Sequence, residues 1–146
     1  MKLYGRPIML LLAACLLSAC TQREERQHIE SEATGFTASY AQCVLGLLRE
    51  SQLSEVPGSG KLSSLGEYST QARDVTVNLR KAKYLTEPAT YVLSGASKEY
   101  TLSVTYTVTS KDHELSGSTI TCEVKLHFDA AKNICSQDNV QCSWPE

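Results

Sequence analysis

The chain has 146 residues, with 14 basic and 16 acidic side chains and a formal net charge of −2 at pH 7. Because it has no basic surplus, it lacks the electrostatic footprint of a nucleic-acid-binding protein, and no nucleic acid is expected among its partners. The length suits one domain with a hydrophobic core of its own.

The first residues have the pattern of an export signal. Lys2 and Arg6 supply positive charge, and residues 8–19 form an apolar run of 12 residues. A helix that crosses the hydrocarbon core of a membrane needs about 20 apolar residues, so the run predicts a signal peptide rather than a transmembrane helix.

The signal ends in Leu17-Ser18-Ala19-Cys20, which resembles the lipobox of bacterial lipoproteins: a branched apolar residue, two small residues and a cysteine. The resemblance implies that residues 1–19 are removed, that the Cys20 thiol carries diacylglycerol and that the new amine is acylated. Two or three acyl chains hold a protein on a membrane without a transmembrane helix. The alternative is an ordinary secretory signal in which Cys20 is incidental.

The residue after the lipidated cysteine bears on the choice of membrane. In Gram-negative lipoproteins an Asp at this position favours retention in the inner membrane, and this chain has Thr21 there. The resemblance therefore implies an outer-membrane anchor with the domain facing the periplasm.

Residues 20–30 are almost wholly polar and charged, and they predict a lipid-anchored tether or the frayed start of a helix. From 31 to 49 the apolar residues recur at intervals of three and four, which predicts one long amphipathic helix. This stripe consists of Ala33, Phe36, Tyr40, Cys43, Val44, Leu47 and Leu48. We expect a single domain that runs from 31 to 146.

The second half of the chain predicts strands. Alternating residues mark 75–79, 100–109 and 119–128, and shorter strands are expected at 89–94 and 134–137. A turn is expected at 86–88, and the basic run 80–83 is expected to be a charged strand edge. In 100–109 and 119–128 one face is apolar and the other is rich in threonine, as in antiparallel strands with one wet face.

One long N-terminal helix packed on an antiparallel meander of four or five strands is an α+β fold. The order of elements resembles that of the cystatin-like and nuclear-transport-factor-like group, in which a helix lies across a curved sheet. That resemblance covers element order alone and implies no function.

The mature chain keeps four cysteines besides the lipidated one: Cys43, Cys122, Cys135 and Cys142. Four cysteines in an exported domain predict two disulfides, for which three connectivities are possible. Cys43 lies on the apolar stripe of the helix, and Cys122 lies on the inner face of 119–128. We therefore predict the pairs Cys43–Cys122 and Cys135–Cys142.

No familiar catalytic motif is present: the chain has no Ser-x-x-Lys, His-Glu-x-x-His, Gly-x-Ser-x-Gly or Cys-x-x-Cys. His28 and His113 are expected to be solvated. His127 shares a wet sheet face with Glu123 and Lys125, where a general base lacks a dry pocket. A zinc site formed by cysteines and His127 lacks the usual ligand spacing. We expect no enzyme, no cofactor and no metal.

The leading hypothesis is a non-enzymatic envelope lipoprotein that binds another protein or a surface component, for which its threonine-rich sheet face offers hydroxyls and flat area. An accessory role in a secretion, pilus or conjugation apparatus fits, as does inhibition of a cell-wall hydrolase. Trp144 either covers an edge of the core or lies exposed as a contact point. The alternative is a periplasmic small-molecule binder that uses a cavity between helix and sheet.

Overall fold

The computed structural model describes residues 6–111 and 114–145, with side chains from Arg23 onward except that of Glu87. Lys2 and His113 lie outside the described residues, as does the side chain of Cys20. The elements in chain order are α1 (Arg6–Arg49), η1 (Leu53–Glu55), β1 (Ser59–Lys61), η2 (Leu62–Glu67), α2 (Thr70–Arg80), β2 (Leu85–Ala96), β3 (Glu99–Val108), β4 (Thr119–Asp129), β5 (Ile134–Gln137) and β6 (Gln141–Ser143).

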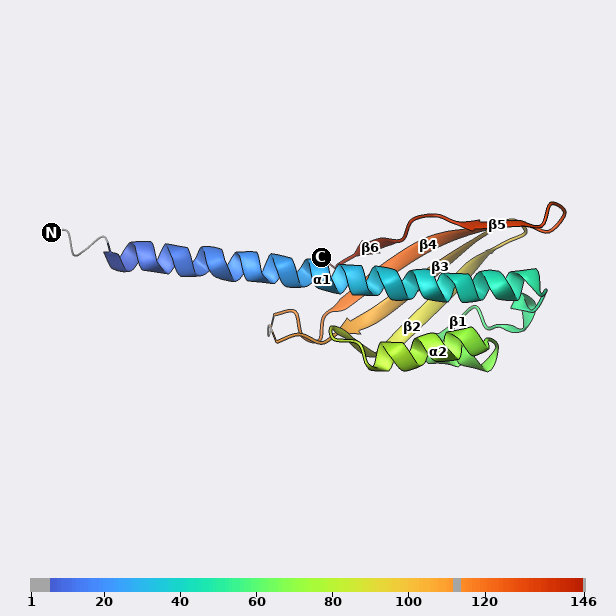
Figure 1. Cartoon of the computed structure of the whole chain (residues 1–146), viewed down its shortest axis with the longest axis horizontal. Coiled ribbons are helices and arrows are strands. Elements are labelled where there is room, and N and C mark those ends of the chain that lie inside the picture. Colours follow the sequence, from blue (N-terminus) through green and yellow to red (C-terminus); the bar gives the residue numbers. More distant parts are fainter. Residues whose placement is uncertain (1–5, 112–113, 146) are drawn as a thin grey trace.

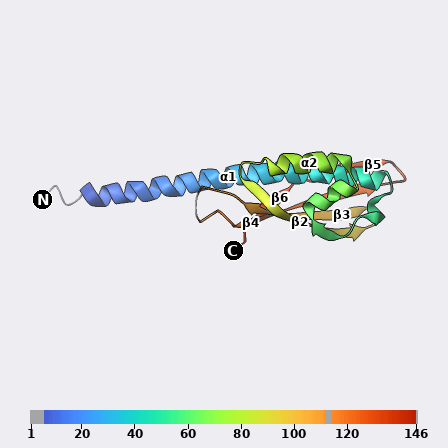
Figure 2. The ribbon, with the colours of Figure 1, turned by 90° about the horizontal axis from the view of Figure 1, so that it is seen from below.

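The chain folds into two layers, a sheet and a pair of helices that cover one of its faces (Figures 1 and 2). All strand pairs are antiparallel in the order β1-β2-β3-β4-β5, and β6 pairs with β4 on the same edge as β5. The first turns of α1 extend beyond the sheet (Figure 1). The predicted α+β class is confirmed, with six described strands instead of four or five. The likeness to cystatin-like rolls stays a prediction from element order.

Helix α1 joins the polar stretch 20–30 to the predicted amphipathic helix without a break. Its burial against the domain begins at Ile29, which is 0% exposed, and the apolar stripe follows from Ala33 to Leu48. Spacings of three and four residues keep this stripe on one side of the helix. The long helix therefore owes its position to a continuous buried face over its second half.

The segment predicted as a strand at 75–79 is part of α2, so that prediction was wrong. Ser69 caps the helix, because its Oγ accepts a hydrogen bond from the backbone nitrogen of Ala72 at 3.1 Å. Ala72, Thr76 and Leu79 are buried at spacings of four and three residues. The helical period and the cap together override the alternation that suggested a strand.

Two smaller expectations were also wrong. The basic run 80–83 closes α2 and leads into β2, so it is not a strand edge. The turn expected at 86–88 lies inside β2, where the pairing with β3 shifts register between Thr86 and Thr90. Strands β1 and β6, with three residues each, were not predicted.

Strands β3 and β4 follow the predicted alternation, with buried side chains toward the helices and partly exposed ones on the other face. The buried set is Leu102, Val104, Tyr106, Val108, Ile120, Cys122, Val124 and Leu126. A tight turn at Ser97 and Lys98 joins β2 to β3. Gly95 precedes it with φ +114°, and a Cβ there would overlap the carbonyl oxygen of Glu99, so the turn requires glycine.

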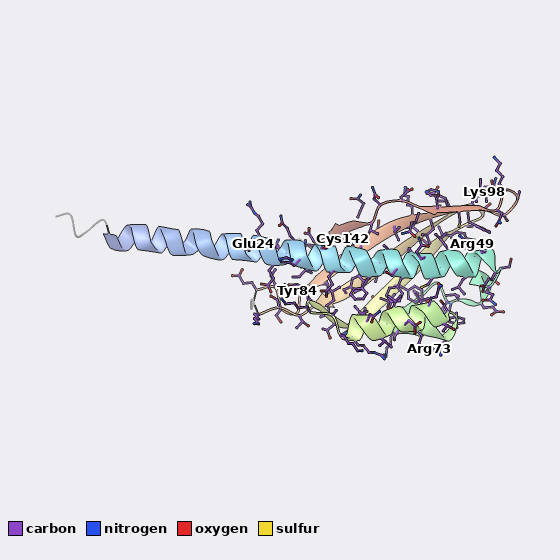
Figure 3. All side chains as sticks on the ribbon, in the orientation of Figure 1. Glu24, Arg49, Arg73, Tyr84, Lys98 and Cys142 are labelled. Atoms are coloured by element: carbon purple, nitrogen blue, oxygen red, sulfur yellow. A yellow bond between two sulfur atoms is a disulfide. The ribbon has the colours of Figure 1, made fainter. Side chains whose placement is uncertain are left out.

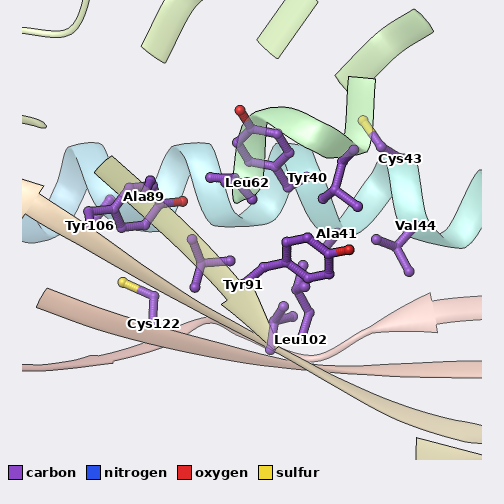
Figure 4. Close-up of a cluster of buried hydrophobic side chains, with 14 of the residues drawn as sticks. Tyr40, Ala41, Cys43, Val44, Leu62, Ala89, Tyr91, Leu102, Tyr106 and Cys122 are labelled. Atoms are coloured by element: carbon purple, nitrogen blue, oxygen red, sulfur yellow. The ribbon is translucent and has the colours of Figure 1, made fainter. Parts of the chain in front are cut away.

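Large side chains fill the space between the helices and the sheet (Figure 4). Tyr40, Tyr91 and Tyr106 are each at most 1% exposed, and aliphatic side chains from α1, η2 and the central strands surround them. No buried polar side-chain atom in the described part of the chain lacks a hydrogen-bond partner. The described side chains thus occupy the space that a helix–sheet ligand cavity would need.

Candidate functional site

The structure joins Cys122 to Cys142, which face each other across β4 and β6 with their Cα atoms 3.9 Å apart. Cys43 and Cys135 are free thiols. A disulfide is therefore confirmed, but the predicted pairs Cys43–Cys122 and Cys135–Cys142 are wrong.

The apolar stripe of α1 is wide enough to face two neighbours, which explains the error. Thr37 faces the sheet, because its Oγ1 lies 2.9 Å from the Tyr106 hydroxyl on β3. Tyr40 faces the other helix, because its hydroxyl lies 2.7 Å from Thr76 Oγ1 on α2. Cys43 lies on the α2 side, and burial raises the pKa of its thiol. Figure 4 accordingly shows Cys43 and Cys122 on different sides of the buried cluster.

Cys135 lies on β5 and contacts the last residue of α1. Its Sγ accepts hydrogen bonds from Arg49 Nη2 at 2.6 Å and from Arg49 Nε at 3.2 Å. The Cys43 thiol instead donates to the carbonyl oxygen of Ser39 at 3.3 Å. The two free thiols face different neighbours and do not converge on a common site.

Two buried tyrosine–threonine pairs tie α1 to the sheet and to α2. Thr37 and Thr76 each donate a hydrogen bond to the carbonyl oxygen four residues earlier in their helix, at 2.7 and 2.9 Å. Since a hydroxyl has one proton, Tyr106 must donate to Thr37 and Tyr40 must donate to Thr76. Burial raises the pKa of the Tyr106 phenol far above its ordinary value, so this donor keeps its proton and holds the layers together.

The stretch 25–34 of α1 is held on both sides where the helix leaves the domain (Figure 3). On one side Glu30 Oε1 accepts a hydrogen bond from Trp144 Nε1 at 2.7 Å, and the Arg26 guanidinium lies 5.3 Å from the Trp144 ring centroid. Trp144 is half-buried and packs against the core. It therefore covers an edge of the core and is not an exposed contact point.

On the other side, Glu25 Oε1 accepts a hydrogen bond from Ser110 Oγ at 2.6 Å, and Glu32 Oε1 accepts one from the backbone nitrogen of Tyr84 at 3.0 Å. His28 stacks on Tyr84, with ring centroids 6.0 Å apart. His28 is exposed, as expected, but it has an aromatic partner. We call these contacts on both sides of 25–34 the clamp; they begin five residues after Cys20.

The sheet face opposite the helices is rich in hydroxyl groups, and we call it the hydroxyl face. Its hydroxyl-bearing residues include Thr90, Thr101, Ser103, Thr105, Thr107, Thr119, Thr121 and Ser143, and the charged side chains of Glu99, Glu123 and Lys125 lie on the same face. At its centre the Thr105 and Thr121 Oγ1 atoms lie 2.9 Å apart. His127 lies on this face as predicted, with its Nε2 3.1 Å from Asp138 Oδ1. No helix of the described chain covers this face (Figure 2).

A groove of about 600 Å³ lies between the second half of α1 and the start of α2. Its lining includes Gln42, Cys43, Glu50, Tyr68, Ser69 and Gln71. Among the described residues, no three His, Cys, Asp or Glu side chains cluster so that they could hold a metal ion. No helix in the described part of the chain combines the length and apolar character needed to cross a membrane.

Comparisons with protein-family models, with curated proteins and with solved structures gave no match.

Proposed function

We propose that this chain is a lipid-anchored protein of the bacterial envelope that acts as a non-enzymatic protein-binding module. The observation that carries the proposal is the asymmetry of its two layers. Both helices cover one face of the sheet, and the hydroxyl face is left without any covering helix in the described chain. The lipid on Cys20 holds the module on the outer membrane, and its docking surface is the hydroxyl face.

The anchor is supported by the lipobox at residues 17–20 and by the chemistry of the cysteines. A disulfide such as Cys122–Cys142 persists in an oxidising compartment, which suits a domain that faces the periplasm. The stretch between Cys20 and the clamp is helical, so the lipid is attached close to the folded domain.

The size of the hydroxyl face suits a protein partner. Strand β3 has 10 residues, which at about 3.4 Å per residue gives a length of roughly 34 Å. Five neighbouring strands at about 4.8 Å spacing give a width of roughly 19 Å. The product, roughly 650 Å², is an upper bound because β1 and β5 have only 3 and 4 residues, and it lies below the roughly 800 Å² that each partner buries in a standard protein–protein interface. The alternative small-molecule binder has less support, because side chains fill the helix–sheet space.

The polarity of this surface indicates how the partner is recognised. Exposed large apolar side chains in the described chain are few and scattered: Val77, Val92 and Ile134. Only Val92 lies near the centre of the hydroxyl face, opposite Ser103 of β3. Hydroxyl groups at regular strand spacing and the exposed charged side chains of Glu99, Glu123 and Lys125 therefore supply the contacts, and the partner requires a flat surface with matching donors, acceptors and charges.

A photo-crosslinking amino acid placed at Thr105 tests the proposal in intact cells, with Val77 on the outer side of α2 as the matched control. We expect a discrete protein adduct from Thr105 that is absent from Val77 and that is lost in the Cys20→Ser chain. Equal adducts from both positions, or none from Thr105, would contradict docking on the hydroxyl face. Membrane fractionation of the same Cys20→Ser chain tests the anchor separately.

A further inference from the structure

Exposed basic side chains gather around the clamp. Arg23 and Arg26 lie on α1 where it leaves the domain, and three lysines lie in the neighbouring loops. We call the set Arg23, Arg26, Lys81, Lys83 and Lys111 the basic collar. Lys83 Nζ lies 5.2 Å from the ring centroid of Tyr84, the clamp residue that stacks on His28. The collar therefore combines two helical arginines with lysines from two loops on the Tyr84 and Ser110 side of α1.

Most acidic groups of this region face inward. The carboxylates of Glu25, Glu30 and Glu32 accept hydrogen bonds from Ser110, Trp144 and the backbone of Tyr84, as the clamp requires. Among the described side chains, the exposed acids at this end are Glu24 and Glu114. The three clamp carboxylates are half-buried, so among the exposed described side chains at this end the five basic groups of the collar outnumber the two acids.

The geometry of α1 brings this charge close to the lipid. A helix rises about 1.5 Å per residue, so Arg23 lies roughly 4.5 Å and Arg26 roughly 9 Å along the axis from Cys20. Lys111 lies close to the same part of the helix, because its neighbour Ser110 donates a hydrogen bond to Glu25, which lies between Arg23 and Arg26 in the chain. These distances are comparable with a Debye length of about 8 Å at physiological ionic strength, so an anionic membrane surface still attracts the collar.

We propose that the basic collar rests on anionic lipid headgroups of the membrane that holds Cys20, and that this contact stands the domain upright. The proposal rests on the lipid anchor proposed above. Trp144 and Tyr84, the half-buried aromatic residues of the clamp, are of the kinds that favour the membrane–water interface. The domain is then attached to the membrane at two points, the lipid on Cys20 and the collar. Because α1 joins them without a break, these two attachments fix the orientation of the domain, whereas a flexible tether would leave it free.

The upright position specifies where a partner lies. From Glu25 to Arg49 the helix spans about 36 Å, and the sheet lies beside it over this length. The hydroxyl face therefore stands side-on within roughly 45 Å of the membrane surface. The partner it fits is a protein seated in, or lying on, the same membrane.

The lysines of the chain allow a direct test on the full lipidated protein. The protein is reconstituted on phosphatidylcholine vesicles with or without roughly a quarter phosphatidylglycerol, and amine acetylation rates are measured by mass spectrometry. We expect labelling of Lys81, Lys83 and Lys111 to slow about fivefold on the anionic vesicles and to recover in high salt. Lys98 and Lys132, in the hairpins at the far end of the domain, are the internal control. Their acetylation rates are expected to be the same on neutral and anionic vesicles.

Charge reversal supplies the matched variants. Arg23→Glu with Arg26→Glu, which leaves the three reporter lysines in place, is expected to abolish their protection, whereas Lys98→Glu with Lys132→Glu is expected to leave it unchanged. Collar lysines that label at the same rate on neutral and anionic vesicles that carry the protein would overturn the collar alone. A protein that fails to float with either vesicle overturns the anchor, and the collar's position on the membrane with it.

Discussion

The disulfide between Cys122 and Cys142 closes a loop with a sequence separation of 20 and fastens β6 to β4. In the loop-entropy model such a closure stabilises the folded state by about 3 kcal/mol. We therefore expect the double variant Cys122→Ala/Cys142→Ala to lose about 3 kcal/mol of unfolding free energy. For a domain of this size that loss lowers Tm by roughly 10 °C.

Urea denaturation of the oxidised protein measures this difference, and Cys135→Ala is the matched control because Cys135 is a free thiol. The control is expected to remain within about 1 kcal/mol of the parent, since it removes only a partly exposed sulfur. If the control lost as much stability as the double variant, the reasoning would be refuted. Non-reducing peptide mapping that joined Cys122 to Cys43 would refute it equally.

Three further predictions concern the core, a turn and the free thiols. Tyr106→Phe is expected to lower the free energy of unfolding, measured in urea, by about 1 kcal/mol. The loss is small because Thr37 still donates to its own carbonyl acceptor and loses only the hydrogen bond from Tyr106. A loss above about 3 kcal/mol would contradict that bonding scheme. In thermal unfolding, Gly95→Ala is expected to cost at least about 2 kcal/mol more stability than Gly117→Ala. Both glycines have positive φ, but only a Cβ at Gly95 would meet backbone atoms. Equal losses of stability would contradict this prediction. At pH 8.5 iodoacetamide is expected to modify Cys135 well before Cys43, because burial raises the pKa of Cys43 and shields it; equal rates by mass spectrometry would contradict this.

The elements with strong periodicity could be predicted from the sequence. Apolar and polar residues alternate along β3 and β4, and the apolar stripe of α1 repeats at helical spacing. The pattern of buried apolar residues is therefore enough to predict these three elements. Helix α2 was mistaken for a strand because Val75, Val77 and Leu79 alternate, although its buried face is Ala72, Thr76 and Leu79 at helical spacing. The cap at Ser69 was the signal that distinguished the helix from a strand. Strands β1 and β6 depend on pairing with longer neighbours and have no periodicity of their own.

The candidate site was predicted less completely. The wet threonine-rich face followed from alternation in β3 and β4 and is present as the hydroxyl face. The clamp was missed, because it joins residues far apart in the chain, such as Glu30 and Trp144, through side-chain bonds that no local pattern records. The disulfide was misassigned because residues on one apolar stripe of α1 can face either the sheet or α2.

Mass spectrometry of the N-terminal peptide from membrane-extracted mature protein tests the lipid anchor on Cys20. The account predicts that the chain begins at Cys20, with diacylglycerol on its thiol and an acyl chain on its amine. An unmodified peptide that spans Ala19 and Cys20, or cleavage at another residue with a free Cys20 thiol, would contradict it.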